Sequence, residues 1–131
     1  ENAEKIHNSI SLLLENSNLN MSDCFVMGFS QGGMMAFELG QILKNHLAGL
    51  AIISSKIISK EHKPNNEFLK TPIFISHGGQ DVVLPVSNYN ESVQVLKKYK
   101  YNFENYLIEK DEHTMSQETI TLFQNFIKKN I

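Results

Sequence analysis

The sequence predicts an α/β fold of about four parallel strands with helices on both faces of the sheet. Short, wholly apolar runs recur along the chain, and such runs are typical of strands buried on both faces of a parallel sheet. Segments with apolar residues at helical spacing separate these runs, which favours parallel βαβ units with right-handed crossovers. The length of 131 residues is that of one domain, so residues 1–131 are treated as a single unit.

Each predicted element has its own signal in the sequence. The first helix, over residues 2–16, ends at a cluster of asparagines. Ser116 and Glu118 predict a helix start near the C-terminus, because a serine caps the first turn and an acid suits its positive end. The stretch 54–70 is polar and loop-like, with room for a short helical turn. The predicted strands are residues 23–29, 48–53, 72–76 and 103–108. The other predicted helices are residues 31–44, residues 86–98 and one that carries Ile120, Phe123 and Ile127. The apolar face of the first helix is formed by Ile6, Ile10, Leu13 and Leu14.

Composition excludes several classes of function. Apolar residues make up 41% and charged residues 20% of the chain, as in an ordinary globular protein. All 12 basic residues are lysines, so the bidentate arginine contacts that read bases cannot form, and we expect no nucleic-acid partner. No apolar run approaches the roughly 18 residues that span a bilayer. We therefore expect no transmembrane segment, and, since no export signal opens the chain, a cytoplasmic location.

Cysteine and histidine usage gives no sign of a metal site. Cys24 is the one cysteine and lies in an apolar run, which excludes an internal disulfide and favours a buried structural thiol. The histidines outside the motifs described below lack the spacing of metal ligands. These histidines are His7, His46 and His62.

A G-x-S-x-G motif lies at residues 28–32, between a predicted buried strand and a predicted helix. The tight turn holds Ser30 in a strained backbone conformation, and we expect glycine at positions 28 and 32 because larger side chains would clash. This turn lifts the Ser30 hydroxyl clear of the backbone at the carboxyl end of the sheet. The Gln31 backbone N–H then faces developing negative charge. Ser30 is the candidate nucleophile and Gln31 the candidate oxyanion donor.

A serine nucleophile needs a histidine to take its proton and a carboxylate to orient that histidine. Asp81 follows the third predicted strand and His113 follows the fourth. Because the carboxyl ends of parallel strands meet at one edge, we expect both to lie near Ser30. Asp111 stays open as an alternative acid. His77 is expected to support the acid loop through hydrogen bonds rather than to act as the base.

Three stretches of the chain carry a family signature. They read Gly-Phe-Ser-Gln-Gly-Gly at 28–33, Thr-Pro-Ile-Phe-Ile-Ser-His-Gly-Gly-Gln-Asp-Val-Val-Leu-Pro at 71–85 and Glu-His-Thr-Met-Ser at 112–116. Together they resemble the phospholipase/carboxylesterase family of α/β-hydrolases, which includes the acyl-protein thioesterases. The resemblance implies a serine esterase or thioesterase that acts on small esters, lysophospholipids or acyl thioesters without a metal or organic cofactor. It assigns Ser30 as nucleophile, Asp81 as acid and His113 as base, while Glu112 stands where the family usually has glycine.

The same resemblance implies a truncated α/β-hydrolase fold in which the predicted strands correspond to the last strands of a larger sheet. The front strands and the loop that donates the second oxyanion N–H are then absent, and losing one such donor costs about 10²–10³ in rate. We expect a weak hydrolase. The alternatives are a catalytically inactive remnant, or one half of a split hydrolase that acts as a binding or assembly module. A flavodoxin-like module fits the strand pattern but leaves the motifs unexplained.

Truncation also has a consequence for association. The strand from Asp23 to Phe29 would lie inside the complete sheet, and without its neighbour it becomes an unpaired apolar edge. We therefore expect a homodimer or a separate front-half partner to pair with this strand.

Overall fold

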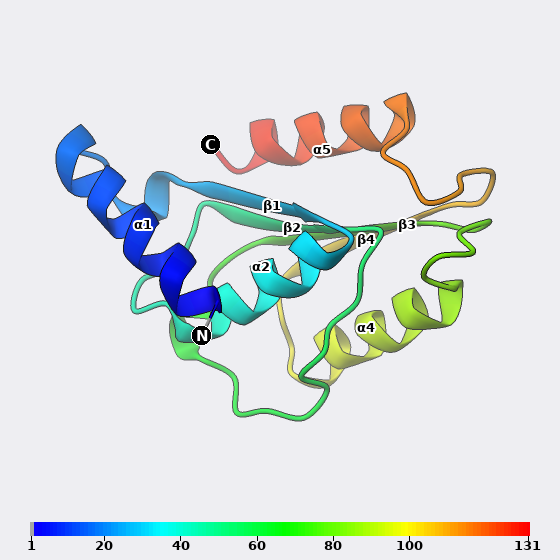
Figure 1. Cartoon of the computed structure of the whole chain (residues 1–131), viewed down its shortest axis with the longest axis horizontal. Coiled ribbons are helices and arrows are strands. Elements are labelled where there is room, and N and C mark those ends of the chain that lie inside the picture. Colours follow the sequence, from blue (N-terminus) through cyan, green and yellow to red (C-terminus); the bar gives the residue numbers. More distant parts are fainter. Residues whose placement is uncertain (1) are drawn as a thin grey trace.

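A computed structural model describes residues 2–131 as one parallel sheet with helices on both faces (Figure 1). The strand order is the chain order, and every neighbouring pair is parallel. The strands are β1 (Phe25–Phe29), β2 (Gly49–Ile53), β3 (Ile73–Gly78) and β4 (Phe103–Ile108), and the helices are α1 (Asn2–Ser17), α2 (Gln31–Ile42), α3 (Asn66–Leu69), α4 (Val86–Lys98) and α5 (Gln117–Lys129), with a 3-10 turn η1 at Met21–Asp23. The predicted α/β fold of four parallel strands is confirmed.

Alternation along the strands divides the core into two layers, one on each face of the sheet. Leu50 and Ile52 of β2 share one layer with apolar residues of α2 and α4. Ala51 and Ile53 share the other layer with Phe126 of α5. Figure 1 shows α5 on one side of the sheet and α2 and α4 on the other. Every residue of β2 and β3 is buried, because both strands have neighbours on two sides and helices on both faces.

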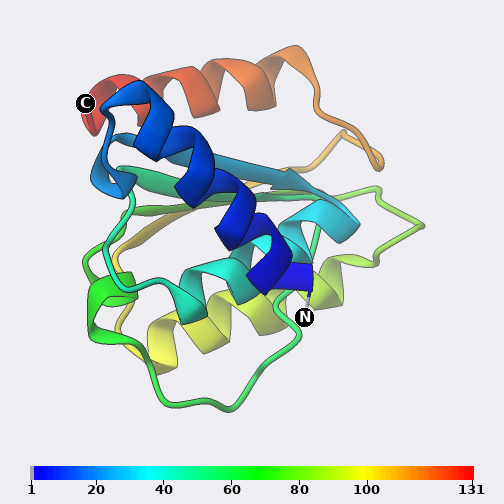
Figure 2. The same cartoon turned by 60° about the vertical axis from the view of Figure 1, so that its left-hand side comes forward.

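Helix α1 packs against α2 and passes beside the β1 edge of the sheet (Figure 2). The predicted apolar face is only partly correct, because Leu13 is 65% exposed and Ile6 38% exposed. The covered stripe instead runs through Ala3, Ile10 and Leu14, which pack against the core. A helix that rests mainly on another helix has only a narrow stripe covered, so two of the four predicted contacts stay outside.

Strand β1 is an edge strand and, among the residues described, pairs with β2 alone. The prediction that this strand is buried on both faces is wrong: Met27 is 44% exposed, and Phe25 and Phe29 are only partly buried. The reason is that no described strand covers the outer side of β1, although Phe25 and Phe29 pack on the same face of the sheet as Phe126 of α5. The nucleophile motif therefore follows an edge strand of the sheet.

Several element ends differ from the predictions for identifiable reasons. β3 continues to Gly78 because His77 and Gly78 still pair with β4. α2 ends at Ile42 because Leu43 is extended, and the Asn65 amide donates to the Leu43 carbonyl. The predicted Ser116 cap is confirmed, since its hydroxyl accepts from the Thr119 N–H at 3.4 Å. None of the helices within residues 2–131 is both long and apolar enough to cross a membrane.

Candidate active site

Ser30 joins β1 to α2 with φ 55° and ψ −122°, a backbone conformation that non-glycine residues rarely adopt. Neighbouring segments hold it there. The Ser30 N–H donates to the Ile53 carbonyl of β2 at 2.9 Å, and the Ser30 carbonyl accepts from the Gly33 N–H at 2.9 Å and from the Ser55 hydroxyl at 2.5 Å. Such strain persists only where surrounding bonds over-determine the conformation, and these three bonds do so.

Two glycines allow this turn to close. A Cβ on Gly28 would lie 2.1 Å from the Gly32 carbonyl oxygen and 2.5 Å from the Gly33 nitrogen, so no side chain fits. A Cβ on Gly33 would lie 2.5 Å from the Ser55 Cβ, so this glycine lets α2 approach the end of β2. The expectation of a clash at Gly32 is wrong, because a Cβ there meets nothing within 4 Å among residues 2–131. Gly32 lines an open cavity instead.

The structure brings Ser30, Asp81 and His113 together at the carboxyl edge of the sheet. The His113 Nε2 lies 3.0 Å from the Ser30 Oγ, and the His113 Nδ1 lies 2.7 Å from the Asp81 Oδ2. A proton on Nδ1 therefore donates to the carboxylate and leaves Nε2 able to accept the Ser30 hydroxyl proton. The Asp81 side chain is fully buried, whereas the His113 ring keeps 17% of its surface exposed. The ring is thus oriented by a buried carboxylate and remains partly exposed.

The loop after β3 holds the Asp81 carboxylate in place. Its Oδ1 accepts from the backbone N–H groups of Val83 and Leu84 at 2.9 and 2.8 Å. Burial raises the pKa of Asp81, but the Leu84 N–H and the His113 ring outweigh burial and hold this pKa below its ordinary value. The His77 Nε2 donates to the Leu84 carbonyl at 2.7 Å and lies 3.5 Å from the Asp81 Oδ2. His77 therefore supports the acid loop, and Asp81 is ionised at neutral pH.

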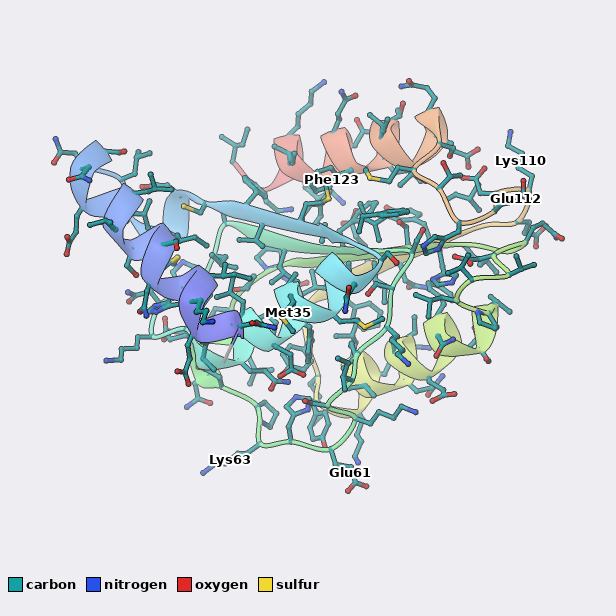
Figure 3. The ribbon with its side chains drawn as sticks, viewed as in Figure 1. Met35, Glu61, Lys63, Lys110, Glu112 and Phe123 are labelled. Carbon is teal, nitrogen blue, oxygen red and sulfur yellow. The ribbon has the colours of Figure 1, made fainter. Side chains whose placement is uncertain are left out.

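The loop after β4 reaches His113 by packing tightly on the end of β3. A Cβ on Gly78 would lie 2.3 Å from the Glu112 carbonyl oxygen and 2.4 Å from the Asp111 carbonyl oxygen. Glu112 is exposed, and Figure 3 shows it with Lys110 at the outer tip of this loop. Asp111, the alternative acid, does not take the place of Asp81, and within the described part of the chain its Oδ2 is buried without a hydrogen-bond partner.

Open space adjoins the reacting groups. The Gln31 N–H belongs to the first turn of α2, where a helix has no acceptor for it. A cavity of about 490 Å³ lies between the starts of α1 and α2, with Met35 of α2 in its lining (Figure 3). A second cavity, of about 540 Å³, lies beside His113. The first is lined by Asn2, Lys5, Ile6, Gln31, Gly32 and Met35, and the second by Val82, Val83, Lys110, Asp111, Glu112, His113 and Thr114.

Sequence reasoning missed two parts of this arrangement. Ser55 was not singled out, although a polar Ser-Ser pair directly after a buried strand marks the same sheet edge. The close approach of Gly78 to the histidine loop was also missed. Residues 2–131 contain no cluster of three or more histidine, cysteine or acidic side chains that could hold a metal ion.

Comparisons with known proteins identify the family and the fold of the chain. The profile of a family described as Phospholipase/Carboxylesterase matches residues 1–131. Acyl-protein thioesterase 1 of Neurospora crassa is 33% identical over 112 residues, which cover 79% of this chain and 44% of that relative. Arabidopsis thaliana SOBER1 has the same fold, with a TM-score of 0.87 at 23% identity over 98% of this chain and 62% of that one. A phospholipase/carboxylesterase from Dyadobacter fermentans matches with a TM-score of 0.75 at 26% identity over 95% of this chain and 61% of that one.

These matches also show how much of each known protein the chain corresponds to. The four strands and their helices correspond to part of an α/β-hydrolase fold. The chain spans less than half the length of the curated relative and about three fifths of the two solved structures.

Proposed function

The chain belongs to the phospholipase/carboxylesterase family, and on that premise we propose that it is a serine hydrolase of carboxylic esters or acyl thioesters. One observation carries the proposal. The Ser30 Oγ, the His113 ring and the Asp81 carboxylate form a continuous hydrogen-bonded series, with distances of 3.0 and 2.7 Å, around a strained serine at the end of a parallel sheet. That arrangement is what nucleophilic acyl transfer by serine requires.

The proposed first step acylates the enzyme. As the Ser30 Oγ attacks the substrate carbonyl carbon, its proton passes to the His113 Nε2, and the carbonyl oxygen becomes an oxyanion facing the Gln31 N–H. Asp81 stays ionised and stabilises the imidazolium, because its lowered pKa keeps it from taking the proton. His113 then protonates the departing alcohol or thiol. The bond from carbon to the leaving group breaks and leaves an ester on Ser30.

The second step reverses the roles with water. The His113 Nε2 takes a proton from water, whose oxygen attacks the acyl carbon, and the Ser30 oxygen leaves with the proton returned by His113. The products are a carboxylic acid and the free serine. An ester or a thioester fits this chemistry, since both present a carbonyl carbon with a leaving group that His113 can protonate.

For the 131-residue chain by itself we expect slow turnover. Gln31 is the one oxyanion donor we identify within residues 2–131, and the loss of one donor typically costs about 10²–10³ in rate. The chain spans 62% of the SOBER1 structure, so further parts of the fold are where a second donor would lie. The competing proposal is a non-catalytic module of the same fold, and the test below separates the two.

Labelling with a fluorophosphonate tests the function directly. We expect one covalent label per chain, located on Ser30 by peptide mass spectrometry, because the probe needs an activated serine but no substrate pocket. The Ser30→Ala variant should take no label. Heat-unfolded wild-type protein is the control for non-specific reaction. If the folded wild-type chain takes no more label than the unfolded one and hydrolyses no p-nitrophenyl ester, the non-catalytic proposal holds.

The free edge of β1 leads to a proposal about assembly. Met27 is 44% exposed beside this edge, and an apolar cavity of about 310 Å³ lies between α1, β1 and α2. For the chain by itself we propose a second copy as the occupant, because two β1 strands related by a two-fold axis pair with each other and cover both edges at once.

Size-exclusion chromatography with light scattering tests this assembly. We expect about twice the chain mass of 14.9 kDa for the wild type. Met27→Lys should give the mass of one chain, since a lysine on an edge strand opposes pairing. A wild-type protein that stays monomeric across the concentration range would contradict the proposal.

A further inference from the structure

The peptide between Ser30 and Gln31 carries both a held carbonyl and the proposed oxyanion donor. The Ser30 carbonyl accepts from the Gly33 N–H at 2.9 Å and from the Ser55 hydroxyl at 2.5 Å. The N–H of the same peptide is that of Gln31. The orientation of one group therefore determines the orientation of the other.

The geometry of a trans peptide makes this dependence strict. Residues 2–131 contain no cis peptide bond, and in a trans peptide the carbonyl and the N–H point in opposite directions. A donor that holds the Ser30 carbonyl on one side therefore aims the Gln31 N–H away from that donor. Rotating this peptide would break both bonds to the carbonyl.

Strain makes such a restraint necessary. Ser30 has a φ of 55°, and a backbone conformation of this kind costs on the order of 1–3 kcal/mol. Rotation of the peptide would relieve that cost unless bonds to the carbonyl opposed it. Ser55 is 1% exposed, so water does not compete for its hydroxyl. Gly33 admits Ser55 to this position because it lacks a Cβ, which would lie 2.7 Å from the Ser55 Oγ.

We propose that Ser55 is a positioning residue, whose hydroxyl fixes the Ser30–Gln31 peptide and thereby aims the Gln31 N–H at the oxyanion. This role rests on the proposed function, since the oxyanion forms only if Ser30 attacks a carbonyl. Two donors on one carbonyl also polarise the peptide, which strengthens the N–H on its other side as a donor. Ser55 does not touch the substrate in this proposal.

The test uses Ser55→Ala with Ser76→Ala as its matched control. Ser76 is also 1% exposed, and within residues 2–131 its hydroxyl has no hydrogen-bond partner, so both variants remove one buried hydroxyl. We expect Ser55→Ala to lower the rate constant of Ser30 labelling by a fluorophosphonate about tenfold, part of the cost of losing a whole oxyanion donor. Ser76→Ala should label at the wild-type rate. Thermal unfolding midpoints of the three proteins establish that each is folded.

A second measurement does not depend on activity. The carbonyl carbon of Ser30 should shift upfield in the NMR spectrum of Ser55→Ala, because it loses one donor, and should stay in place in Ser76→Ala. An unchanged Ser30 carbonyl shift in Ser55→Ala would overturn the positioning role. A wild-type labelling rate in a folded Ser55→Ala protein would also overturn it. If the wild type takes no label at all, the proposed function fails, and the carbon shift still decides whether Ser55 holds the peptide.

Discussion

Replacing Asp81 by asparagine should lower the rate of Ser30 acylation by about 10⁴-fold, as expected when the histidine of a triad is held in the wrong tautomer. The carboxylate accepts hydrogen bonds on both oxygens, from Val83 and Leu84 on Oδ1 and from His113 on Oδ2. An asparagine can place its oxygen on only one of these sides. If the oxygen faces the two backbone N–H groups, the amide NH₂ faces His113 and selects the tautomer whose Nε2 carries the proton. That nitrogen cannot then accept the proton of Ser30.

The measurement is the rate constant of p-nitrophenyl ester hydrolysis or of fluorophosphonate labelling, compared with that of Asp111→Asn. Asp111 is buried to a similar degree but does not bond to His113, so its variant should retain most of the wild-type rate. Equal losses in both variants would mean that the effect comes from the fold rather than from His113.

The same substitution should make the free energy of unfolding depend less on pH in acid. The folded-state pKa of Asp81 lies below its ordinary value of 3.8, so the unfolded chain binds this proton first as the pH falls. The stability that Asp81 contributes is complete above about pH 4 and is lost as the pH drops through the folded-state pKa. Urea unfolding at a series of pH values should therefore show a steeper loss of unfolding free energy below pH 4 in the wild type than in Asp81→Asn.

Gly28→Ala should have the largest effect on the fold. The added Cβ would lie 2.1 Å from the Gly32 carbonyl oxygen and 2.5 Å from the Gly33 nitrogen, and these backbone atoms belong to the turn that carries Ser30. Neither can move without displacing the start of α2. We expect a loss of about 3 kcal/mol or more in unfolding free energy, at or above the usual cost of overpacking. Any folded fraction should label slowly, because Ser30 is displaced from His113.

Gly32→Ala is the matched control, since it adds the same methyl group four residues along the same turn. A Cβ there meets nothing within 4 Å among the residues described, so only the helix propensity changes. We expect this variant to gain about 0.5–1 kcal/mol of stability. Chemical unfolding curves of the two variants give the comparison. Similar stability of Gly28→Ala and the wild type would show that the turn relaxes without cost.

Much of the fold could be predicted because each strand is a short apolar run with polar or helical neighbours. The ends of the helices and strands are harder to predict. β3 runs on through His77 and Gly78, which have no apolar pattern, because the ladder to β4 continues past the core. Helical spacing predicts α1 but not the width of the stripe that its partner covers, so it predicts a buried Leu13, whereas Leu13 is exposed. The exposure of Met27 likewise depends on which strands lie beside β1, and the local sequence pattern does not contain that information.

The candidate site, too, could be predicted only in part. Ser30, Asp81 and His113 could be expected near one another, since each follows a predicted strand and parallel strands end at one edge. Contacts between loops could not be predicted. Ser55 reaches the Ser30 carbonyl only because α2 comes close to Ser55 at Gly33, and no sequence motif predicts this contact. The motif predicts a steric role for both Gly28 and Gly32, whereas the surroundings of Gly32 are open.

β1 lies at the edge of the sheet, and this position affects the local unfolding of the protein. A strand held along one side opens at lower free energy than one held along both, and local opening of this kind precedes global unfolding. The turn at Ser30 is anchored to the sheet through the Ile53 carbonyl, so fraying of β1 would release the nucleophile while β2 and β3 stay folded. In this chain we therefore expect the population of the reactive geometry to depend on the local stability of β1 as well as on that of the central core.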